Sequence, residues 1–235
     1  MATIYLIRHG QASFGSDNYD KLSELGCRQA QILGEYLSSI GVQLDAAYCG
    51  ELQRQRKTAK LALASQSKAL EPGIDVRFNE VRNDEQVEAL LSQAIERDPA
   101  LGEVVESGLN SSKAYQKVIE GVFTLWTSPG FEHPGIQSWQ DYSSGVIAAL
   151  RGVMAEQGSG KVSAIFTSGG TIATAVAHVL GVAPELTYRF YEPVINCSIT
   201  ELFYSGDKIS LSYFNDHSYL RLKGLDSGEE LVTYR

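Results

Sequence analysis

Three short polar segments of this sequence combine the residue types that bind and attack an anion. They are Arg8-His9-Gly10, Cys49 to Arg54, and Ser168-Gly169-Gly170. An arginine guanidinium binds phosphate oxygens through paired hydrogen bonds, and a glycine lets the backbone approach a ligand closely. A histidine imidazole can act as a nucleophile toward phosphorus. Together these residue types predict a pocket that binds an anion and attacks it.

Each of these segments follows an apolar run that is typical of a buried strand. The runs cover residues 4–7, 46–49 and 162–167. The first, Ile4-Tyr5-Leu6-Ile7, is apolar at every position, as expected of a strand buried on both faces of a parallel sheet. Ligands of open α/β sheets bind outside the carboxyl ends of the strands. We therefore expect the three polar segments to meet at one edge of a sheet.

Helices are predicted between these strands. Apolar residues recur at helical spacing from Leu25 to Ile40, with Ser23 as a plausible N-cap and Gly41 as a stop. Further elements are expected as helices over residues 52–64 and 171–180, and as strands over residues 198–203 and 209–214. This alternation predicts an α/β fold with three layers, α/β/α, around a mostly parallel central sheet.

The stretch from about residue 83 to 138 interrupts the alternation. It is acidic at first and then contains Gly108, Ser111-Ser112, and Pro-Gly pairs at residues 129–130 and 134–135. We interpret it as a helical insertion that caps the carboxyl ends of the strands, within a single domain spanning residues 1–235.

Composition and charge exclude several classes of protein. Of the 235 residues, 43 % are hydrophobic and 20 % are charged, and 20 Lys and Arg against 28 Asp and Glu give a net charge of −8. We expect no nucleic-acid partner, because such proteins carry a basic face. The sequence has no apolar run long enough for a membrane span, and we expect no signal peptide, because only four apolar residues separate Thr3 from Arg8. Three scattered cysteines, Cys27, Cys49 and Cys197, fit a reducing compartment. We expect a cytoplasmic protein without membrane contact, and the sequence gives no indication of its oligomeric state.

The polar segments, with several others in the same order, resemble the motifs of the histidine phosphatase superfamily, which has the phosphoglycerate mutase-like fold. The resemblance extends over almost the whole chain. The matching segments are Ile4 to Ala12, Leu22 to Gly26 with Gln29-Ala30, Tyr48 to Arg54 with Thr58-Ala59, Phe78 to Glu80, Asn196 to Thr200, and Asn215 to His217.

This resemblance implies a phosphatase that needs no metal and no cofactor and acts on a phosphorylated small molecule. His9 would carry the phosphoryl group as a phosphohistidine, and Arg8 and Arg54 would neutralise its oxygens. Glu80 would protonate the leaving oxygen and then deprotonate water, so its pKa is expected to be raised. The residues predicted to contact the substrate are Gly10, Ser168, Gly169 and His217.

One residue departs from the pattern of the family. Most members have a histidine where this chain has Ser168, and that histidine donates a hydrogen bond to the phosphoryl group. A serine hydroxyl supplies only a neutral donor, and charge-assisted hydrogen bonds are about twice as strong. We therefore expect a slow phosphatase, or one in which another group substitutes, with His217 as the first candidate and His133 as the second.

Two other functions stay open at this point. The serine also fits a pseudoenzyme that binds phosphorylated ligands without hydrolysing them. A phosphoglycerate mutase is less favoured, because mutases of the family continue Arg-His-Gly with Glu-Ser and an Asn shortly after, whereas this chain has Gln11-Ala12-Ser13.

Overall fold

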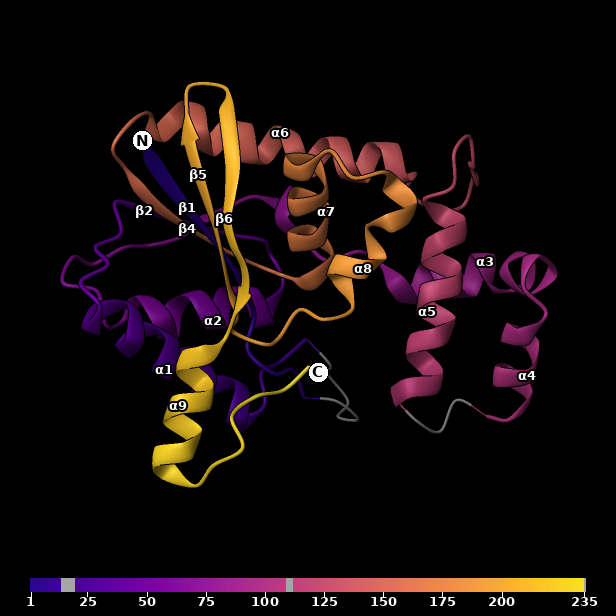
Figure 1. Ribbon diagram of the computed structural model, residues 1–235, viewed down its shortest axis with the longest axis horizontal. Coiled ribbons are helices and arrows are strands. Elements are labelled where there is room, and N and C mark those ends of the chain that lie inside the picture. The colour runs from indigo at the N-terminus through magenta and orange to yellow at the C-terminus, as the bar shows by residue number, and fades with distance from the viewer. Residues whose placement is uncertain (14–19, 109–111, 235) are drawn as a thin grey trace.

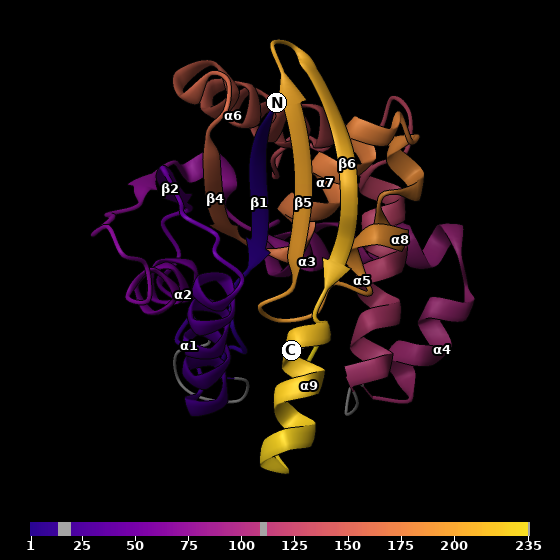
Figure 2. The same cartoon turned by 60° about the vertical axis from the view of Figure 1, so that its left-hand side comes forward.

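The computed structural model describes residues 1–13, 20–108 and 112–234. Within these residues the chain forms a six-stranded sheet in the order β3-β2-β4-β1-β5-β6, and Figure 2 shows its long strands side by side. The strands are β1 (Ala2–Arg8), β2 (Ala46–Cys49), β3 (Gly73–Ile74), β4 (Val162–Thr167), β5 (Ile199–Ser205) and β6 (Lys208–Asp216). The pairs β1–β4, β2–β4 and β2–β3 are parallel, and β1–β5 and β5–β6 are antiparallel. The predicted α/β fold with a mostly parallel sheet is confirmed.

Helices connect these strands. They are α1 (Glu24–Ser39), α2 (Gln53–Leu63), α3 (Asn83–Arg97), α4 (Ala100–Glu106), α5 (Ser112–Trp126), α6 (Trp139–Gln157), α7 (Gly169–Leu180), α8 (Tyr188–Tyr191) and α9 (Ser218–Ser227), with 3₁₀ turns η1 (Val76–Phe78) and η2 (Pro184–Leu186). Ser23 caps α1 as predicted, because its side chain accepts from Gly26 N. Helix α7 begins at Gly169, two residues before the predicted start, because both glycines adopt helical backbone and extend it toward β4.

Both faces of the sheet are covered, and the side chains of β1 show how. Ile4 and Leu6 pack in one buried cluster with residues of α6 and α7, while Tyr5 and Ile7 pack in a second cluster with residues of α1, α2 and α9. Successive side chains of a strand point to opposite faces, so β1 contributes to both. Figures 1 and 2 show α6 and α7 on one side of the sheet, and α1 and α2 on the other.

The segment predicted as an insertion forms α3, α4 and α5, which Figure 1 shows on the right, beside α8. Its buried side chains, such as Leu90 and Phe123, belong to the same apolar cluster as Ile4 and Ile165 of the sheet. The capping role of this segment stays a prediction.

Two structural features concern the expected cellular compartment. No helix of the described ranges is long and apolar enough to cross a membrane. All three cysteines are free thiols. A cytoplasmic location stays a prediction.

Candidate active site

The carboxyl ends of β1 and β4 bring the first and third polar segments together. The two strands are parallel, and Arg8 pairs with Thr167, so His9 and Ser168 are the next residues of neighbouring strands. His9 N donates to Thr167 O at 2.9 Å, which extends this pairing past the strand ends. The second polar segment follows β2 and leads into α2, whose first residues face the same edge.

His9 lies at the centre of this arrangement and is only 3 % exposed. Arg54 Nε lies 3.1 Å from His9 Nε2, and His9 Nδ1 lies 2.7 Å from Gly10 O. Because a guanidinium only donates, Nε2 is the accepting nitrogen and Nδ1 carries the proton that Gly10 O accepts. Burial lowers the pKa of His9 well below its usual range, and the nearby charges of Arg54 and Arg8 lower it further. The imidazole is therefore neutral, and the lone pair of Nε2 accepts from Arg54.

The two arginines approach His9 from different elements. Arg8, at the end of β1, donates from one terminal nitrogen to Val194 O. Arg54, in the first turn of α2, is 8 % exposed and forms an ion pair with Asp20 at 2.8 Å. Their charges act on both His9 and Glu80. The structure therefore brings together the four predicted catalytic residues.

Asp20 is a residue of this site that sequence reasoning missed. Besides its ion pair with Arg54, its carboxylate accepts from Gln53 N at 2.8 Å at the start of α2. The N-cap position of α2 is Leu52, which makes no side-chain cap. An apolar residue at an N-cap leaves helix N–H groups without an acceptor, and this was a signal that another segment must supply one.

Glu80 follows η1 and reaches the N-terminus of α7. Its Oε1 accepts from Val81 N and from Gly170 N, both at 2.9 Å. Burial raises the pKa of Glu80 above its ordinary value, although Arg54, Arg8 and the two backbone donors act in the opposite direction. A carboxyl group with a raised pKa beside two guanidinium groups suits a general acid.

The predicted substrate-binding glycines are explained by close packing. A Cβ at Gly10 would lie 2.3 Å from Gly26 O, and a Cβ at Gly169 would lie 2.9 Å from the ring of Tyr191. Gly10 N also donates to Thr58 Oγ1 at 3.0 Å. Both positions therefore require glycine for the loop to fit, and a contact with substrate stays a prediction.

Ser168 is completely buried and its hydroxyl is engaged by a residue of α2. Gln55 Nε2 donates to Ser168 Oγ at 2.8 Å. Gln55, like Asp20, was not singled out from the sequence. Its position directly after Arg54 on α2 is the only sequence signal it carries.

His217 directly follows β6, which lies two strands from β1 in the sheet, and its Nδ1 pairs with Asn215 O at 2.8 Å. Within the described residues, the charges that shift the pKa of His9 and of Glu80 come from the two arginines. The second candidate, His133, accepts from Gly135 N in the loop between α5 and α6. Substitution by either histidine stays a prediction without geometric support.

A hydrogen-bond network anchors the loop that carries His9. Asn196 Nδ2 donates to His9 O at 3.1 Å, and Thr233 Oγ1 donates to Asn196 Oδ1 at 2.9 Å. Gln29 Nε2 donates to Thr233 Oγ1 at 2.8 Å, while Gln29 Oε1 accepts from Gln11 N at 2.8 Å. The C-terminal segment thus positions the loop that carries His9.

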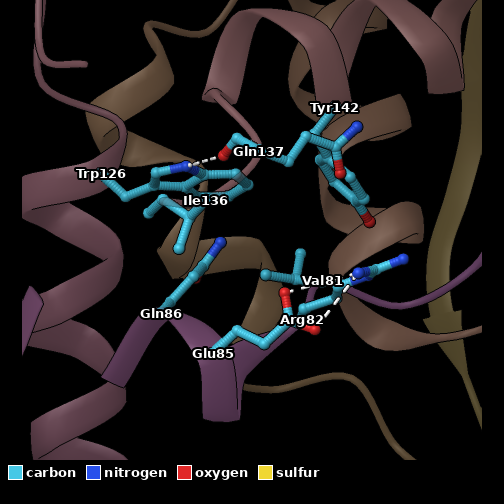
Figure 3. Close-up of a pocket in the computed structure, with 8 residues that line it drawn as sticks. All are labelled: Val81, Arg82, Glu85, Gln86, Trp126, Ile136, Gln137 and Tyr142. Atoms are coloured by element: carbon cyan, nitrogen blue, oxygen red, sulfur yellow. Dashed lines mark hydrogen bonds and ion pairs between the residues drawn. The ribbon is translucent and has the colours of Figure 1, made fainter. Parts of the chain in front are cut away.

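A small pocket lies beside the segment that carries Glu80, as Figure 3 shows. It is lined by Val81, Arg82, Glu85, Gln86, Trp126, Ile136, Gln137 and Tyr142. Its volume of about 10 Å³ is about what one water molecule needs. The pocket is too small for a substrate. Trp126 fills its wall and donates from Nε1 to Gln137 O at 2.8 Å.

No group of three or more His, Cys, Asp or Glu side chains in residues 1–13, 20–108 and 112–234 is placed to hold a metal ion. Independence from metals stays a prediction that needs a measurement.

Comparison with known proteins identifies the family. The profile of the histidine phosphatase superfamily (branch 1) matches residues 4–101 and 85–217. This chain belongs to the histidine phosphatase superfamily. The resemblance stated from the motifs is confirmed.

One of the sequence relatives of this chain is a mutase. A 2,3-bisphosphoglycerate-dependent phosphoglycerate mutase from Methylocella silvestris is 30 % identical over 145 residues, which cover 59 % of this chain and 61 % of the mutase. The match therefore spans less than two thirds of that mutase.

Solved structures share the fold at low identity. The phosphoserine phosphatase of Entamoeba histolytica, in complex with phosphoserine, superposes with a TM-score of 0.66 at 17 % identity, over 94 % of this chain and 100 % of that chain. A phosphoglycerate mutase from Bacillus anthracis has a TM-score of 0.61 at 20 % identity, over 93 % and 94 %. A mycobacterial glucosyl-3-phosphoglycerate phosphatase has a TM-score of 0.59 at 18 % identity, over 91 % and 98 %.

Proposed function

We propose that this protein is a metal-independent phosphatase that hydrolyses phosphomonoesters of small molecules through a phosphohistidine on His9. The observation that carries the proposal is the state of His9. It is buried and neutral, its Nδ1 proton is held by Gly10 O, and Nε2 faces Arg54. A nucleophile needs an unprotonated nitrogen such as Nε2, and the guanidinium that donates to it supplies the charge that phosphoryl transfer requires.

The reaction proceeds in two steps. In the first, His9 Nε2 attacks phosphorus, the bond to the leaving oxygen breaks, and protonated Glu80 gives its proton to that oxygen. In the second, the Glu80 carboxylate takes a proton from water, the water oxygen attacks phosphorus, and the bond to Nε2 breaks. Arg8 and Arg54 neutralise the phosphoryl oxygens in both steps, where catalysis is mostly positioning and electrostatics. The Ser168 hydroxyl donates one neutral hydrogen bond to the phosphoryl group.

The class of substrate is proposed from the family. The structural neighbours named above include phosphatases of phosphoserine and of glucosyl-3-phosphoglycerate, and we propose a similarly small phosphorylated substrate here. The helices α3 to α5 are proposed to cap the strand ends and to contact its leaving group. We further propose that the protein acts in the cytoplasm.

Two other functions are each favoured by one observation. Ser168 in place of a histidine favours a pseudoenzyme that binds phosphorylated ligands. The mutase of Methylocella silvestris favours a phosphoglycerate mutase, although Gln11-Ala12 in this chain differs from the segment typical of mutases.

Release of p-nitrophenol from p-nitrophenyl phosphate between about pH 5 and 8 tests the proposal, with EDTA present and His9→Ala in parallel. We expect turnover that EDTA leaves unchanged and that His9→Ala abolishes. A pseudoenzyme would bind inorganic phosphate without turnover, and a mutase would interconvert phosphoglycerates. Turnover retained in a folded His9→Ala protein would exclude the mechanism.

A further inference from the structure

A buried glutamine forms the floor of the site beside Ser168. Gln55 follows Arg54 on α2 and is 0 % exposed. Its Nε2 donates to Phe78 O at 3.0 Å and to Ser168 Oγ at 2.8 Å. Because a carbonyl oxygen only accepts, the Phe78 carbonyl sets the orientation of the amide. Ser168 Oγ is therefore the acceptor of its hydrogen bond with Gln55.

The fold makes room for this amide at Gly50. A Cβ at residue 50 would lie 2.0 Å from Gln55 Oε1 and 2.6 Å from Asn79 Oδ1, so a larger residue would displace the amide. Gln55 Oε1 is itself buried without a hydrogen-bond partner among the described residues. An unpaired buried acceptor opposes folding, which favours a functional role for this side chain over a role in stability.

The hydroxyl of Ser168 does not cap α7, although Ser168 is the N-cap residue of that helix. At this position a serine side chain normally accepts from a backbone N–H of the first turn. Here it makes no such cap. Gly170 N instead donates to Glu80 Oε1. Since Ser168 Oγ accepts from Gln55, its proton points elsewhere, and no acceptor for it occurs in the described part of the chain.

We propose that Gln55 is a positioning residue that holds the Ser168 hydroxyl in the orientation that donates to the phosphoryl group on His9. This inference rests on the proposed function. Two consecutive residues of α2 then contact the two strand ends of the site, because Arg54 donates to His9 after β1 and Gln55 donates to Ser168 after β4. The transferring phosphoryl oxygen is the acceptor that the Ser168 proton lacks.

A double-mutant cycle tests this role with Ser168→Ala, Gln55→Met and the double variant. We expect Ser168→Ala to lower kcat by about 10²-fold, the usual cost of one donor to a developing charge. Gln55→Met keeps the side-chain length and leaves the hydroxyl free to rotate. Its kcat should fall by about 10-fold to 10²-fold, the upper limit being the cost of misplacing a group by about 1 Å. The double variant should equal Ser168→Ala alone, because Gln55 acts through Ser168.

A second variant separates orientation from packing. Gln55→Glu has nearly the same shape, but its carboxylate would accept the Ser168 proton instead of donating. Its kcat should fall at least as far as that of Gln55→Met and should recover as pH falls and the carboxyl group becomes a donor. Gln66→Met is the matched control, since Gln66 is a partly buried glutamine whose amide bonds Leu44 N and Val42 O ahead of the amino end of β2, away from the site. It should keep the kcat of the unaltered protein.

The outcomes separate this inference from the proposed function. If the unaltered protein turns over and Gln55→Met keeps its kcat, or if the two losses multiply in the double variant, the role of Gln55 is wrong while the phosphatase stands. If the unaltered protein has no turnover, the proposed function fails. The affinity for inorganic phosphate then decides about Gln55: equal weakening in the Ser168→Ala, Gln55→Met and double variants supports its role, and unchanged affinity in Gln55→Met overturns it.

Discussion

Asp20 holds the same groups that a phosphate would use, so removing its charge should tighten anion binding. Its carboxylate pairs with Arg54 at 2.8 Å and accepts from Gln53 N at 2.8 Å, at the N-terminus of α2. A helix N-terminus and a guanidinium together form an anion-binding site. A phosphate that binds there must first displace Asp20. Asp20→Asn keeps an oxygen for Gln53 N and loses the charge that competes.

The expected change in phosphate affinity follows from the solvent exposure of the ion pair between Arg54 and Asp20. The side chains of Arg54 and Asp20 are 10 % and 28 % exposed, so the interaction lies between an exposed ion pair, worth about 0 to 1 kcal/mol, and a hydrogen bond to a charged group, worth about 1.5 to 3 kcal/mol. We take about 1 to 2 kcal/mol. At about 1.4 kcal/mol for each factor of ten, Asp20→Asn should lower the Kd for phosphate by about 5-fold to 30-fold.

Calorimetric titration with inorganic phosphate measures this change. Asp45→Asn is the matched control, because Asp45, like Asp20, pairs with a basic side chain and accepts from a backbone N–H. Its partners are Lys161, at 2.7 Å, and Val162 N, at the opposite edge of the sheet. Its Kd for phosphate should equal that of the unaltered protein. Weaker phosphate binding in Asp20→Asn, with the control unchanged, would mean that Asp20 orients Arg54 for the substrate, and the reasoning would be refuted.

Three further predictions concern the residues around His9. Ser168→His alone should not raise kcat, and it should destabilise the fold by about 1 to 3 kcal/mol through overpacking against Gln55. The double variant with Gln55→Ala should regain stability and have a higher kcat. Thermal unfolding measures the stability of each variant, and turnover measures its kcat. Because burial raises the pKa of Glu80, its acid form persists to higher pH, and the rate should fall as pH rises through that pKa. Glu80→Gln should lower kcat by about 10²-fold to 10⁴-fold and remove this limb of the pH–rate profile; a limb that persists would assign it to another group. Thr233→Val leaves partners in a buried network unpaired and should cost about 1 to 3 kcal/mol in the free energy of unfolding, measured by urea titration, and an unchanged stability would show that the C-terminal segment does not hold the loop of His9.

The sequence predicted those parts of the protein that depend on neighbouring residues. The strands before His9, Gly50 and Ser168, and the cap of α1 by Ser23, follow from apolar runs and turn residues that lie together in the chain. The proximity of the strand ends followed from the parallel sheet, because its topology requires them to meet at one edge.

Contacts between distant segments could not be predicted in this way. Gln55 and Ser168 are 113 residues apart, and Gln29 and Thr233 are 204 residues apart. Nothing in the local pattern indicates which buried amide meets which hydroxyl, because the packing of α2 and of the C-terminal segment decides it. For His217, the motif predicts a contact with substrate, which stays a prediction, and the sheet order puts β5 between its strand and β1.

The central claim is that His9 carries the phosphoryl group, and trapping the intermediate tests it most directly. The protein is mixed with p-nitrophenyl phosphate, quenched within the first turnover under alkaline denaturing conditions that preserve phosphohistidine, and mapped by peptide mass spectrometry. We predict one phosphoryl group on His9 in the unaltered protein and none in His9→Ala. Turnover without a phosphoryl group on His9, or a phosphoryl group elsewhere that appears and decays at the rate of turnover, would contradict the mechanism.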